Sequence, residues 1–198
     1  GRTWSGNVIP YLVEKGQDRH LINEEGPPKV IGLSLQPDNP DTMLAASANH
    51  GMFRSTDGGK TWERSNTGLT SSKLHHVDFA ISNPDVAYVT THEGIFRTDD
   101  AGKSWIERSN GLTYKFVTPI AIDPRNEDIV FVGTATEVYT THPRHKNRGM
   151  HRGEGLYKTI DGGKNWVRSD KGIYEAKIAQ MGNHPLIPFN IWVGGESG

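Results

Sequence analysis

The chain has 198 residues, no cysteine and an almost balanced charge of 22 basic against 23 acidic side chains. The balance argues against a nucleic-acid groove, which requires a clear basic excess. The lack of cysteine excludes disulfides and thiolate metal sites, and no apolar run is long enough to span a membrane. The 23 glycines and 11 prolines are typical of short strands joined by many turns, and therefore favour an all-β protein.

Taken in order, the chain predicts one strand, a long connection and then groups of short strands. Residues 1–5 are the first strand, and residues 6–28 are a connection that is longer than the few residues usual between strands. Groups of four strands follow at residues 29–66, 74–109 and 116–170, and residues 176–198 add two strands. The last group of four is longer than the others because of an insertion at residues 135–154.

The same motif separates the third and fourth predicted strands of each group. It occupies residues 55–62, 98–105 and 159–166, and residues 1–4 match its last part. Its Asp-Gly-Gly core suits a turn with positive φ, which glycine adopts without a Cβ clash. The aspartate can accept hydrogen bonds from backbone N–H groups, and the tryptophan can fold over the corner and bury its apolar face. Ala101 replaces the first glycine of one copy, so the second glycine is expected to be the demanding one. The residues with these structural roles are Asp57, Gly59, Trp62, Asp100, Gly102, Trp105, Asp161, Gly163 and Trp166.

The motif resembles the Asp-box, or BNR, repeat, and the resemblance covers nearly the whole chain. This repeat is found in β-propellers of sialidases, xyloglucan-active glycoside hydrolases, sortilin-type receptors and photosystem assembly factors. The resemblance implies an all-β fold of propeller blades, each with four antiparallel strands, and a single partial propeller over residues 1–198. Residues 1–5 would then be the last strand of a preceding blade, and residues 176–198 the first strands of a further one.

Fewer than four complete blades cannot close a ring, because each blade buries its faces only against its neighbours. We therefore expect the remaining blades to come from the same longer chain, with about six to eight or more blades in total. Closure by a homo-oligomer is the other possibility.

Loops of such a propeller carry function more often than its scaffold does. The resemblance implies that second-to-third-strand loops and blade connections share one face, here called the loop face, opposite the Asp-box corners. His50, His75, His76, His92 and Glu93 are expected on it, with the insertion. The candidate binding residues are His92, His142, His145, His151, Arg144 and Arg148. The insertion is predicted to be a basic, solvated loop, with a metal or anion site as the alternative; no cofactor is predicted.

Two carboxylates are the weak catalytic candidates. Glycoside hydrolysis needs two carboxyl groups about 5 to 9.5 Å apart. Asp78, predicted to begin an inner strand, and Glu93 are candidates near the loop face, although Asp78 suits equally a polar residue at the channel edge. A sialidase would need three arginines on a carboxylate, but Arg54, Arg97 and Lys158 occupy repeat-equivalent positions and are expected to be structural. The two catalytic aspartates of a xyloglucanase cannot be matched to any residue of this sequence.

These observations favour a ligand-binding or scaffold module that presents its loop face to a protein or glycan. The alternative is a glycoside hydrolase of the Asp-box type, either xyloglucanase-like or sialidase-like. We expect an extracytoplasmic or secreted location, and no nucleic-acid partner.

Overall fold

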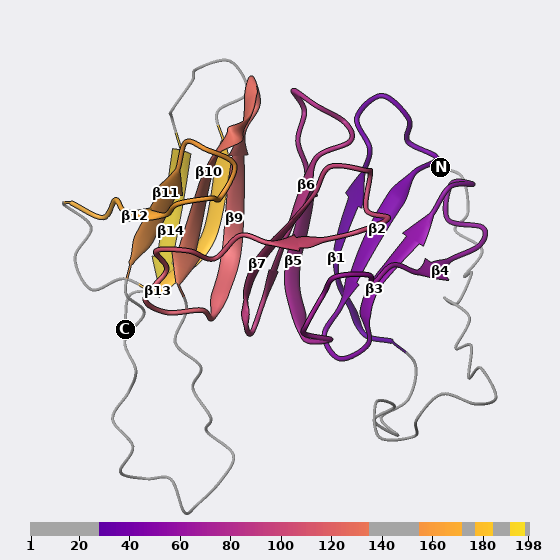
Figure 1. Cartoon of the computed structure of the whole chain (residues 1–198), viewed down its shortest axis with the longest axis horizontal. Helices are drawn as coiled ribbons and strands as arrows, with labels where there is room; N and C mark the ends of the chain where they lie inside the picture. Colours follow the sequence, from indigo (N-terminus) through magenta and orange to yellow (C-terminus); the bar gives the residue numbers. More distant parts are fainter. Residues whose placement is uncertain (1–27, 135–154, 172–176, 184–190, 197–198) are drawn as a thin grey trace, which may run out of the picture.

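The computed structural model describes residues 28–134, 155–171, 177–183 and 191–196. Every regular element in this part of the chain is a strand. The strands form consecutive sheets that lie side by side, from indigo to yellow in Figure 1. The predicted all-β class is confirmed.

Each of the first three sheets is an antiparallel meander of four strands. The first contains β1 (Val30–Leu35), β2 (Met43–Ser47), β3 (Gly51–Ser55) and β4 (Glu63–Arg64). The second contains β5 (Leu74–Phe79), β6 (Ala87–Thr91), β7 (Gly94–Thr98) and β8 (Ile106–Glu107). The third contains β9 (Val117–Asp123), β10 (Asn126–Thr134), β11 (Leu156–Thr159) and β12 (Val167–Arg168). A fourth sheet pairs β13 (Lys177–Asn183) with β14 (Ile191–Glu196).

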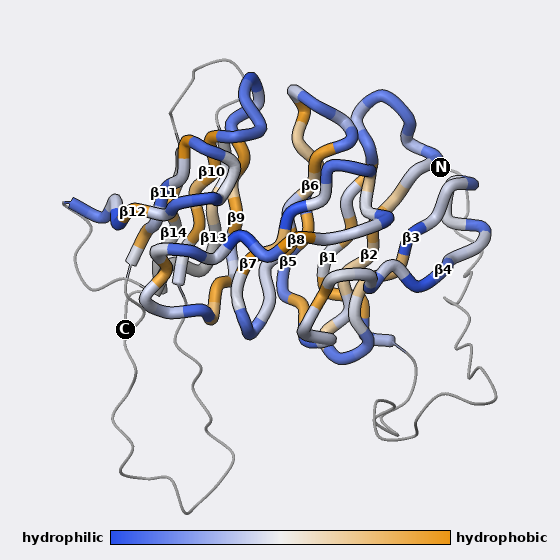
Figure 2. Tube along the Cα trace, in the orientation of Figure 1, coloured by the Kyte–Doolittle hydropathy of each residue, from blue (hydrophilic) through white to orange (hydrophobic). Residues whose placement is uncertain are grey.

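The core lies between the sheets, and Figure 2 shows hydrophobic strands with hydrophilic turns at their ends. Side chains alternate between the two faces of a strand, so Leu44 and Ala46 of β2 point to the same side. They pack with Met52 against Val77 and Phe79 of the second sheet, and all are buried. A second apolar cluster joins the second sheet to the third in the same way. Burial between successive sheets therefore stabilises the array.

The Asp-box corners are closed by their own side chains, as the motif predicted. Asp57 Oδ1 accepts hydrogen bonds from Ser55 Oγ at 2.8 Å and Thr61 N at 2.9 Å, and Ser55 Oγ accepts from Gly59 N at 2.9 Å. The hydrogen bonds from Thr61 and Ser55 lower the pKa of Asp57 to about 2. The corners at Asp100 and Asp161 repeat this pattern. The aspartates are thus occupied in holding the turn.

Both central positions of the corner have positive φ. In the second corner φ is +55° at Ala101 and +85° at Gly102. A Cβ on Gly102 would lie 2.5 Å from Leu44 Cδ2, whereas Ala101 fits. The expectation that the second glycine is the demanding one agrees with this geometry. The first position nevertheless keeps the left-handed backbone even when it is alanine.

Two of the three tryptophans connect neighbouring sheets, where the sequence predicted that each would cover its own corner. Trp105 Nε1 donates to Ser65 O at 3.0 Å, and Trp166 Nε1 donates to Arg108 O at 2.6 Å, in each case in the preceding sheet. Both indoles are buried. Trp62, in the first sheet, is half-buried and donates to Gly59 O of its own corner at 3.1 Å. The Asp-box tryptophan is therefore a contact between sheets wherever a preceding sheet is described.

Candidate functional site

The turns of each meander divide between two faces. On one face, the Asp-box corners bond to the first turn of their own sheet, with Gly58 N donating to Asp41 O at 3.0 Å. On the other, the turn after β6 bonds to the connection before β5, with His92 N donating to Lys73 O at 3.2 Å. The loop face and the Asp-box face are thus opposite ends of the strands. The β6–β7 turn with His92 and Glu93 belongs to the loop face.

Three rings gather on the loop face where the second and third sheets meet. The His75 and His92 rings are stacked, with centroids 4.6 Å apart and planes inclined by 23°. Phe116 lies 4.6 Å from His75 and 4.7 Å from His92, edge-on to the latter. Aromatic contacts of this kind contribute about 0.5–1.5 kcal/mol each beyond their buried area. We call His75, His92 and Phe116 the ring cluster.

The repeat itself provides a control for what the ring cluster does. The strand registers make Ile31 of the first sheet and Thr118 of the third equivalent to His75. The position of Phe116, just before the inner strand, is Lys73 in the second sheet. Residues that the scaffold requires recur in every sheet, as the corner aspartates do, whereas the rings do not recur. The ring cluster is therefore specific to this junction.

Burial keeps His75 neutral. Burial, together with the neighbouring His92, lowers the pKa of His75 to about 4. Its Nε2 atom is buried and makes no hydrogen bond within the described residues. A buried polar atom without a partner costs about 1–3 kcal/mol. The imidazole can therefore accept or donate one hydrogen bond to an incoming group.

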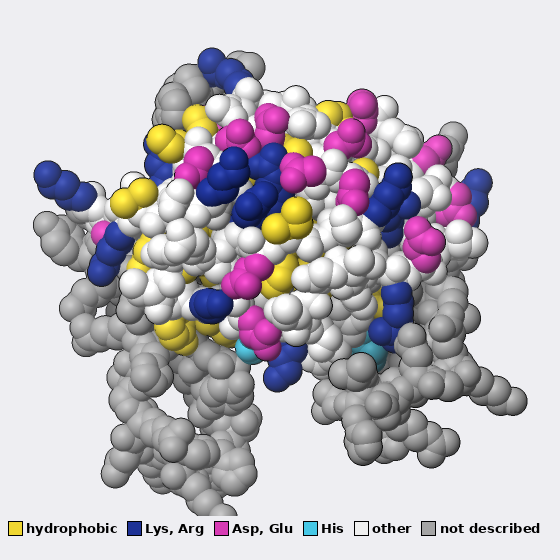
Figure 3. Space-filling model, in the orientation of Figure 1, with side chains coloured by type: hydrophobic (Ala, Val, Ile, Leu, Met, Phe, Trp, Pro, Cys, Tyr) yellow, Lys and Arg dark blue, Asp and Glu magenta, His cyan; other side chains and the backbone are white. Residues whose placement is uncertain are grey.

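Two charged residues, Glu93 and Lys115, adjoin His92 and Phe116 of the ring cluster in sequence. Glu93 is exposed and its Oε2 accepts a hydrogen bond from Thr70 Oγ1 at 3.2 Å. Lys115, adjacent to Phe116, is exposed and pairs with Glu107 at 3.0 Å. In the view of Figure 3, histidine reaches the surface only at the lower margin, away from the charges of both signs in the middle of the molecule. Glu93 and Lys115 thus place one negative and one positive side chain next to residues of the ring cluster.

Asp78 lies elsewhere, and its predicted position was wrong. It is the fifth residue of β5 rather than the first, and it pairs with Tyr88 of β6. Thr91, which precedes the turn with Glu93, pairs with Leu74 at the other end of β5. At about 3.3 Å per residue, Asp78 is roughly 13 Å from Leu74. The structure therefore does not bring Asp78 and Glu93 to one bond.

Asp78 takes part in a contact between inner strands. Ser34 Oγ of β1 donates to Asp78 Oδ1 at 3.0 Å and accepts from Phe79 N at 3.0 Å. Burial raises the pKa of Asp78, although the Ser34 hydrogen bond and the nearby His76 oppose the shift. His75 and His76, expected in a loop, are residues of β5 itself. A polar contact between sheets is the role that this geometry gives Asp78.

Five binding candidates, His142, His145, His151, Arg144 and Arg148, lie outside the described residues, as does the whole of the insertion at 135–154. Within the part of the chain that is described, no three His, Cys, Asp or Glu side chains gather as metal ligands. That part also contains no helix that could cross a lipid bilayer.

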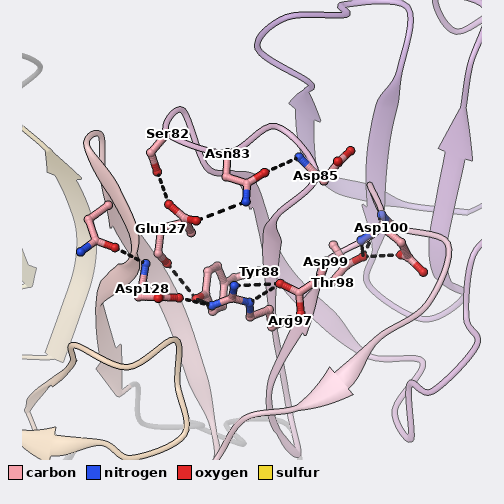
Figure 4. Close-up of polar contacts among 12 residues, drawn as sticks. Ser82, Asn83, Asp85, Tyr88, Arg97, Thr98, Asp99, Asp100, Glu127 and Asp128 are labelled. Carbon is pink, nitrogen blue, oxygen red and sulfur yellow. Dashed lines mark hydrogen bonds and ion pairs between the residues drawn. The ribbon is translucent and has the colours of Figure 1, made fainter.

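The arginines at repeat-equivalent positions are inter-sheet contacts, and Figure 4 shows those of Arg97. Arg97 Nη1 donates to Tyr88 Oη at 2.9 Å and to Asp128 Oδ1 of the third sheet at 2.5 Å, and Nη2 pairs with Asp99 at 2.7 Å. Arg54 Nε donates to Ala101 O of the second sheet at 2.9 Å. These side chains do not converge on a carboxylate site.

A match to a family model agrees with the Asp-box propeller fold. The Sortilin-Vps10 model, described as sortilin, neurotensin receptor 3, matches residues 50–189. The chain belongs to the Sortilin-Vps10 family. No curated protein matches it.

Solved structures similar to this Sortilin-Vps10 member are propellers of several kinds. A GH74 enzyme from Niastella koreensis is 16% identical, with a TM-score of 0.62, covering 86% of this chain and 28% of its own. An ancestral GH74 enzyme is 17% identical, with a TM-score of 0.61, covering 80% and 22%. YCF48 bound to D1 peptide is 16% identical, with a TM-score of 0.52, covering 83% and 47%. The chain thus spans between about a fifth and about half of these proteins, and the likeness establishes the fold alone.

Sequence reasoning about this Sortilin-Vps10 member included His92 but missed Phe116. A signal for Phe116 was present, because an aromatic residue stands where the preceding repeat has Lys73. Comparing the repeats position by position finds such departures, whereas a search for known catalytic motifs does not.

Proposed function

We propose that this chain is a ligand-binding propeller module that captures a protein ligand on its loop face, with the ring cluster as the contact. The observation that carries the proposal is that the rings do not recur in the repeat, although the corner residues do. The family description names a receptor, and one similar structure holds a peptide, and both support a protein ligand over a glycan.

The physical case rests on what the rings offer. Aromatic side chains dominate the binding free energy of protein interfaces when they are centrally placed and surrounded by polar residues. His92 and Phe116 are half-buried, so part of each ring can contact a ligand while the other part stays packed. A ligand group that reaches His75 Nε2 would satisfy a buried atom, which adds specificity.

The test compares ligand capture by the purified chain and by loop-face variants on a peptide array and a glycan array. His92→Ala and Phe116→Ala should each reduce capture roughly ten-fold, as expected for an interface residue worth about 1–2 kcal/mol. Lys60→Ala, at an exposed position of an Asp-box corner, is the control and should leave capture unchanged. Equal capture by all variants would refute the loop-face site, and capture by glycans alone would refute a protein ligand.

The insertion is tested separately. Alanine replacement across residues 137–152 removes the histidines and arginines predicted to bind, namely His142, His145, His151, Arg144 and Arg148. Weaker capture would extend the site to the insertion, and unchanged capture would confine it to the ring cluster.

A glycoside hydrolase is the second candidate. It draws on the likeness to GH74 enzymes and on burial that raises the pKa of Asp78, as a general acid requires. Release of sugars from xyloglucan, mixed glucans or sialosides, abolished by Asp78→Asn, would favour it. Absence of hydrolysis on all of them, or hydrolysis indifferent to Asp78→Asn, counts against it.

We also propose an extracytoplasmic or secreted location, because the family description names a neurotensin receptor. Fractionation of cells that produce the tagged full-length protein tests this, and a protein confined to the cytosol would contradict it.

A further inference from the structure

The residue pair Asn110–Gly111 follows β8 at the junction of the second and third sheets. Both residues are exposed, and Gly111 has a φ of +89°. Glycine after asparagine leaves the backbone nitrogen unshielded, because no side chain stands between that nitrogen and the asparagine carboxamide. The pair is therefore accessible both to water and to attack by its own backbone.

Asn110 joins the two sheets through its backbone and its side chain. Its carbonyl oxygen accepts a hydrogen bond from Trp166 N at 2.9 Å. Its Nδ2 donates to Asn165 Oδ1 at 2.9 Å and to Lys164 O at 3.2 Å. All three partners belong to the third Asp-box corner. A chemical change at Asn110 would therefore alter the hydrogen bonds between the second and third sheets.

The nucleophile is available at Gly111. Among the hydrogen bonds of the described residues, none uses the Gly111 amide, whereas the next amide, Leu112 N, donates to Ser109 O. Two other asparagines are protected: Asn83 precedes a proline, and the amide after Asn165 donates to Asn110 O. Asn110 alone among these combines an exposed carboxamide with a free following amide.

We propose that Asn110 is a site of spontaneous deamidation. The Gly111 nitrogen attacks Asn110 Cγ and forms a five-membered succinimide. The bond from Cγ to Nδ2 breaks, and Nδ2 leaves as ammonia with the proton of the Gly111 amide. Water then adds to either ring carbonyl and opens the ring, which gives aspartate or isoaspartate. The net reaction consumes one water, adds one carboxylate and its negative charge to the chain, and releases ammonia, which takes up the carboxyl proton as ammonium.

The products weaken the junction. A carboxylate at position 110 places an acceptor opposite Asn165 Oδ1 and Lys164 O, where Asn110 had donated two hydrogen bonds. In isoaspartate the main chain runs through Cβ and Cγ, so the carbonyl that accepts from Trp166 N becomes a free carboxylate that no longer belongs to the main chain. The corresponding position in the junction of the first and second sheets is Thr67, whose carbonyl accepts from Trp105 N at 2.9 Å. Threonine cannot undergo this reaction, so the effect is confined to one junction.

The rate is tested by ageing the folded chain in mildly alkaline buffer and mapping its peptides by mass spectrometry with isoaspartyl methyltransferase labelling. The Asn110 peptide should convert at least about ten times faster than the peptides with Asn66 and Asn165, because their following residues carry side chains. Conversion of Asn110 no faster than that of those peptides would overturn the proposal.

Two variants separate the chemistry from its consequence. Asn110→Thr, which copies Thr67, should abolish the modification and keep the tryptophan fluorescence of the chain constant on ageing. Asn110→Asp, before ageing, should shift the summed tryptophan emission towards that of solvent-exposed indole, through Trp166, and lower the melting temperature. Should Asn110→Thr not fold, Asn110→Gln takes its place as the amide that closes the ring slowly. Unchanged emission and melting in Asn110→Asp would overturn the weakening of the junction.

Discussion

At the scale of single residues, the two central positions of the Asp-box corner differ in how well they tolerate a side chain. The side chains that accept or donate within the corner are satisfied locally, and the left-handed backbone is present at both central positions. The two central positions differ in the free space available for a Cβ atom. Gly102 faces the buried Leu44 side chain, whereas Ala101 already carries its methyl group.

This difference predicts unequal responses to two neighbouring substitutions. Gly102→Ala should destabilise the chain by about 2–4 kcal/mol, because a left-handed alanine and a clash with Leu44 act together. Ala101→Gly should change the unfolding free energy by less than about 1 kcal/mol, because relief of strain offsets the greater freedom of the unfolded chain. Urea unfolding measures both, and equal effects would contradict the assignment.

The depressed pKa of His75 predicts a pH dependence of stability. The folded chain binds a proton at His75 only near pH 4, whereas the unfolded chain binds one near 6.5. The unfolding free energy should therefore be highest above pH 6.5 and fall as the pH drops from 6.5 to 4. The loss should be about 1–2 kcal/mol, since His75 is partly exposed and solvent screens the effect.

The difference between the wild type and His75→Phe isolates this contribution. Both proteins keep His76, whose pKa burial lowers in the same direction, and Asp78, whose pKa burial raises. The slope of stability against pH between 4 and 6.5 should be smaller in His75→Phe. Parallel curves would rule out His75 as the cause.

At the scale of the elements, each sheet is joined to the next by polar contacts as well as by its apolar face. The third strand provides a basic residue that reaches the following sheet, and the Asp-box tryptophan reaches the preceding one. Arg97 is the most strongly held of these, with two carboxylates and the hydroxyl of Tyr88. Burial raises the pKa of Tyr88, so its hydroxyl keeps the proton that it donates to Glu127 O at 2.8 Å.

Removal of the Arg97 guanidinium should loosen the second and third sheets. Arg97→Met should lower the unfolding free energy by about 2–3 kcal/mol, because its side chain is 13% exposed and its partners lose charge-assisted hydrogen bonds. Lys115→Met is the matched control, since it breaks an exposed ion pair with Glu107 and should cost less than about 1 kcal/mol. Equal costs in thermal unfolding would show that Arg97 is only a surface charge.

How much the sequence could predict depends on the range of the interaction. The corner of Asp57 was predictable because its donors and acceptors lie within a few residues. The meander was predictable because the corners repeat. The reach of Trp105 to Ser65 and the meeting of His75 with Phe116 were not, because they join residues that only the packing of two sheets brings together. Asp78 was misplaced because two histidines obscure the apolar alternation that starts β5 at Leu74.

At the scale of the whole molecule, the free face of the first sheet differs from its counterparts. Leu33 is 52% exposed and Leu35 is 46% exposed, whereas the equivalent Val77 and Phe79 are 2% and 4% exposed. Trp62, on the same sheet, donates to its own corner, and among the described residues it makes no contact to a preceding sheet of the kind that Trp105 makes. We propose that another blade covers this face, from the same longer polypeptide in preference to a second copy.

The uncovered face predicts the behaviour of the 198-residue chain in isolation. It should self-associate, and Leu33→Glu with Leu35→Glu should suppress this, because exposed apolar faces drive association. Ile81→Glu, which replaces an isoleucine that is 66% exposed in a turn, is the control. Solution mass by light scattering measures the outcome, and a cooperative melt of a monomeric wild type would contradict the need for a covering blade.

The outermost strands β4, β8 and β12 are only two residues long. A sheet that ends in so short a strand presents few unpaired backbone N–H and C=O groups at its edge. Such an edge is a poor template for strand pairing with another protein molecule. The outer edges of the first three sheets therefore resist pairing with another chain, unlike the six-residue β14 of the fourth sheet. A loop inserted beside β8 or β12 would break few backbone hydrogen bonds between strands. These outer edges are therefore suitable places to attach reporters without disturbing the loop face.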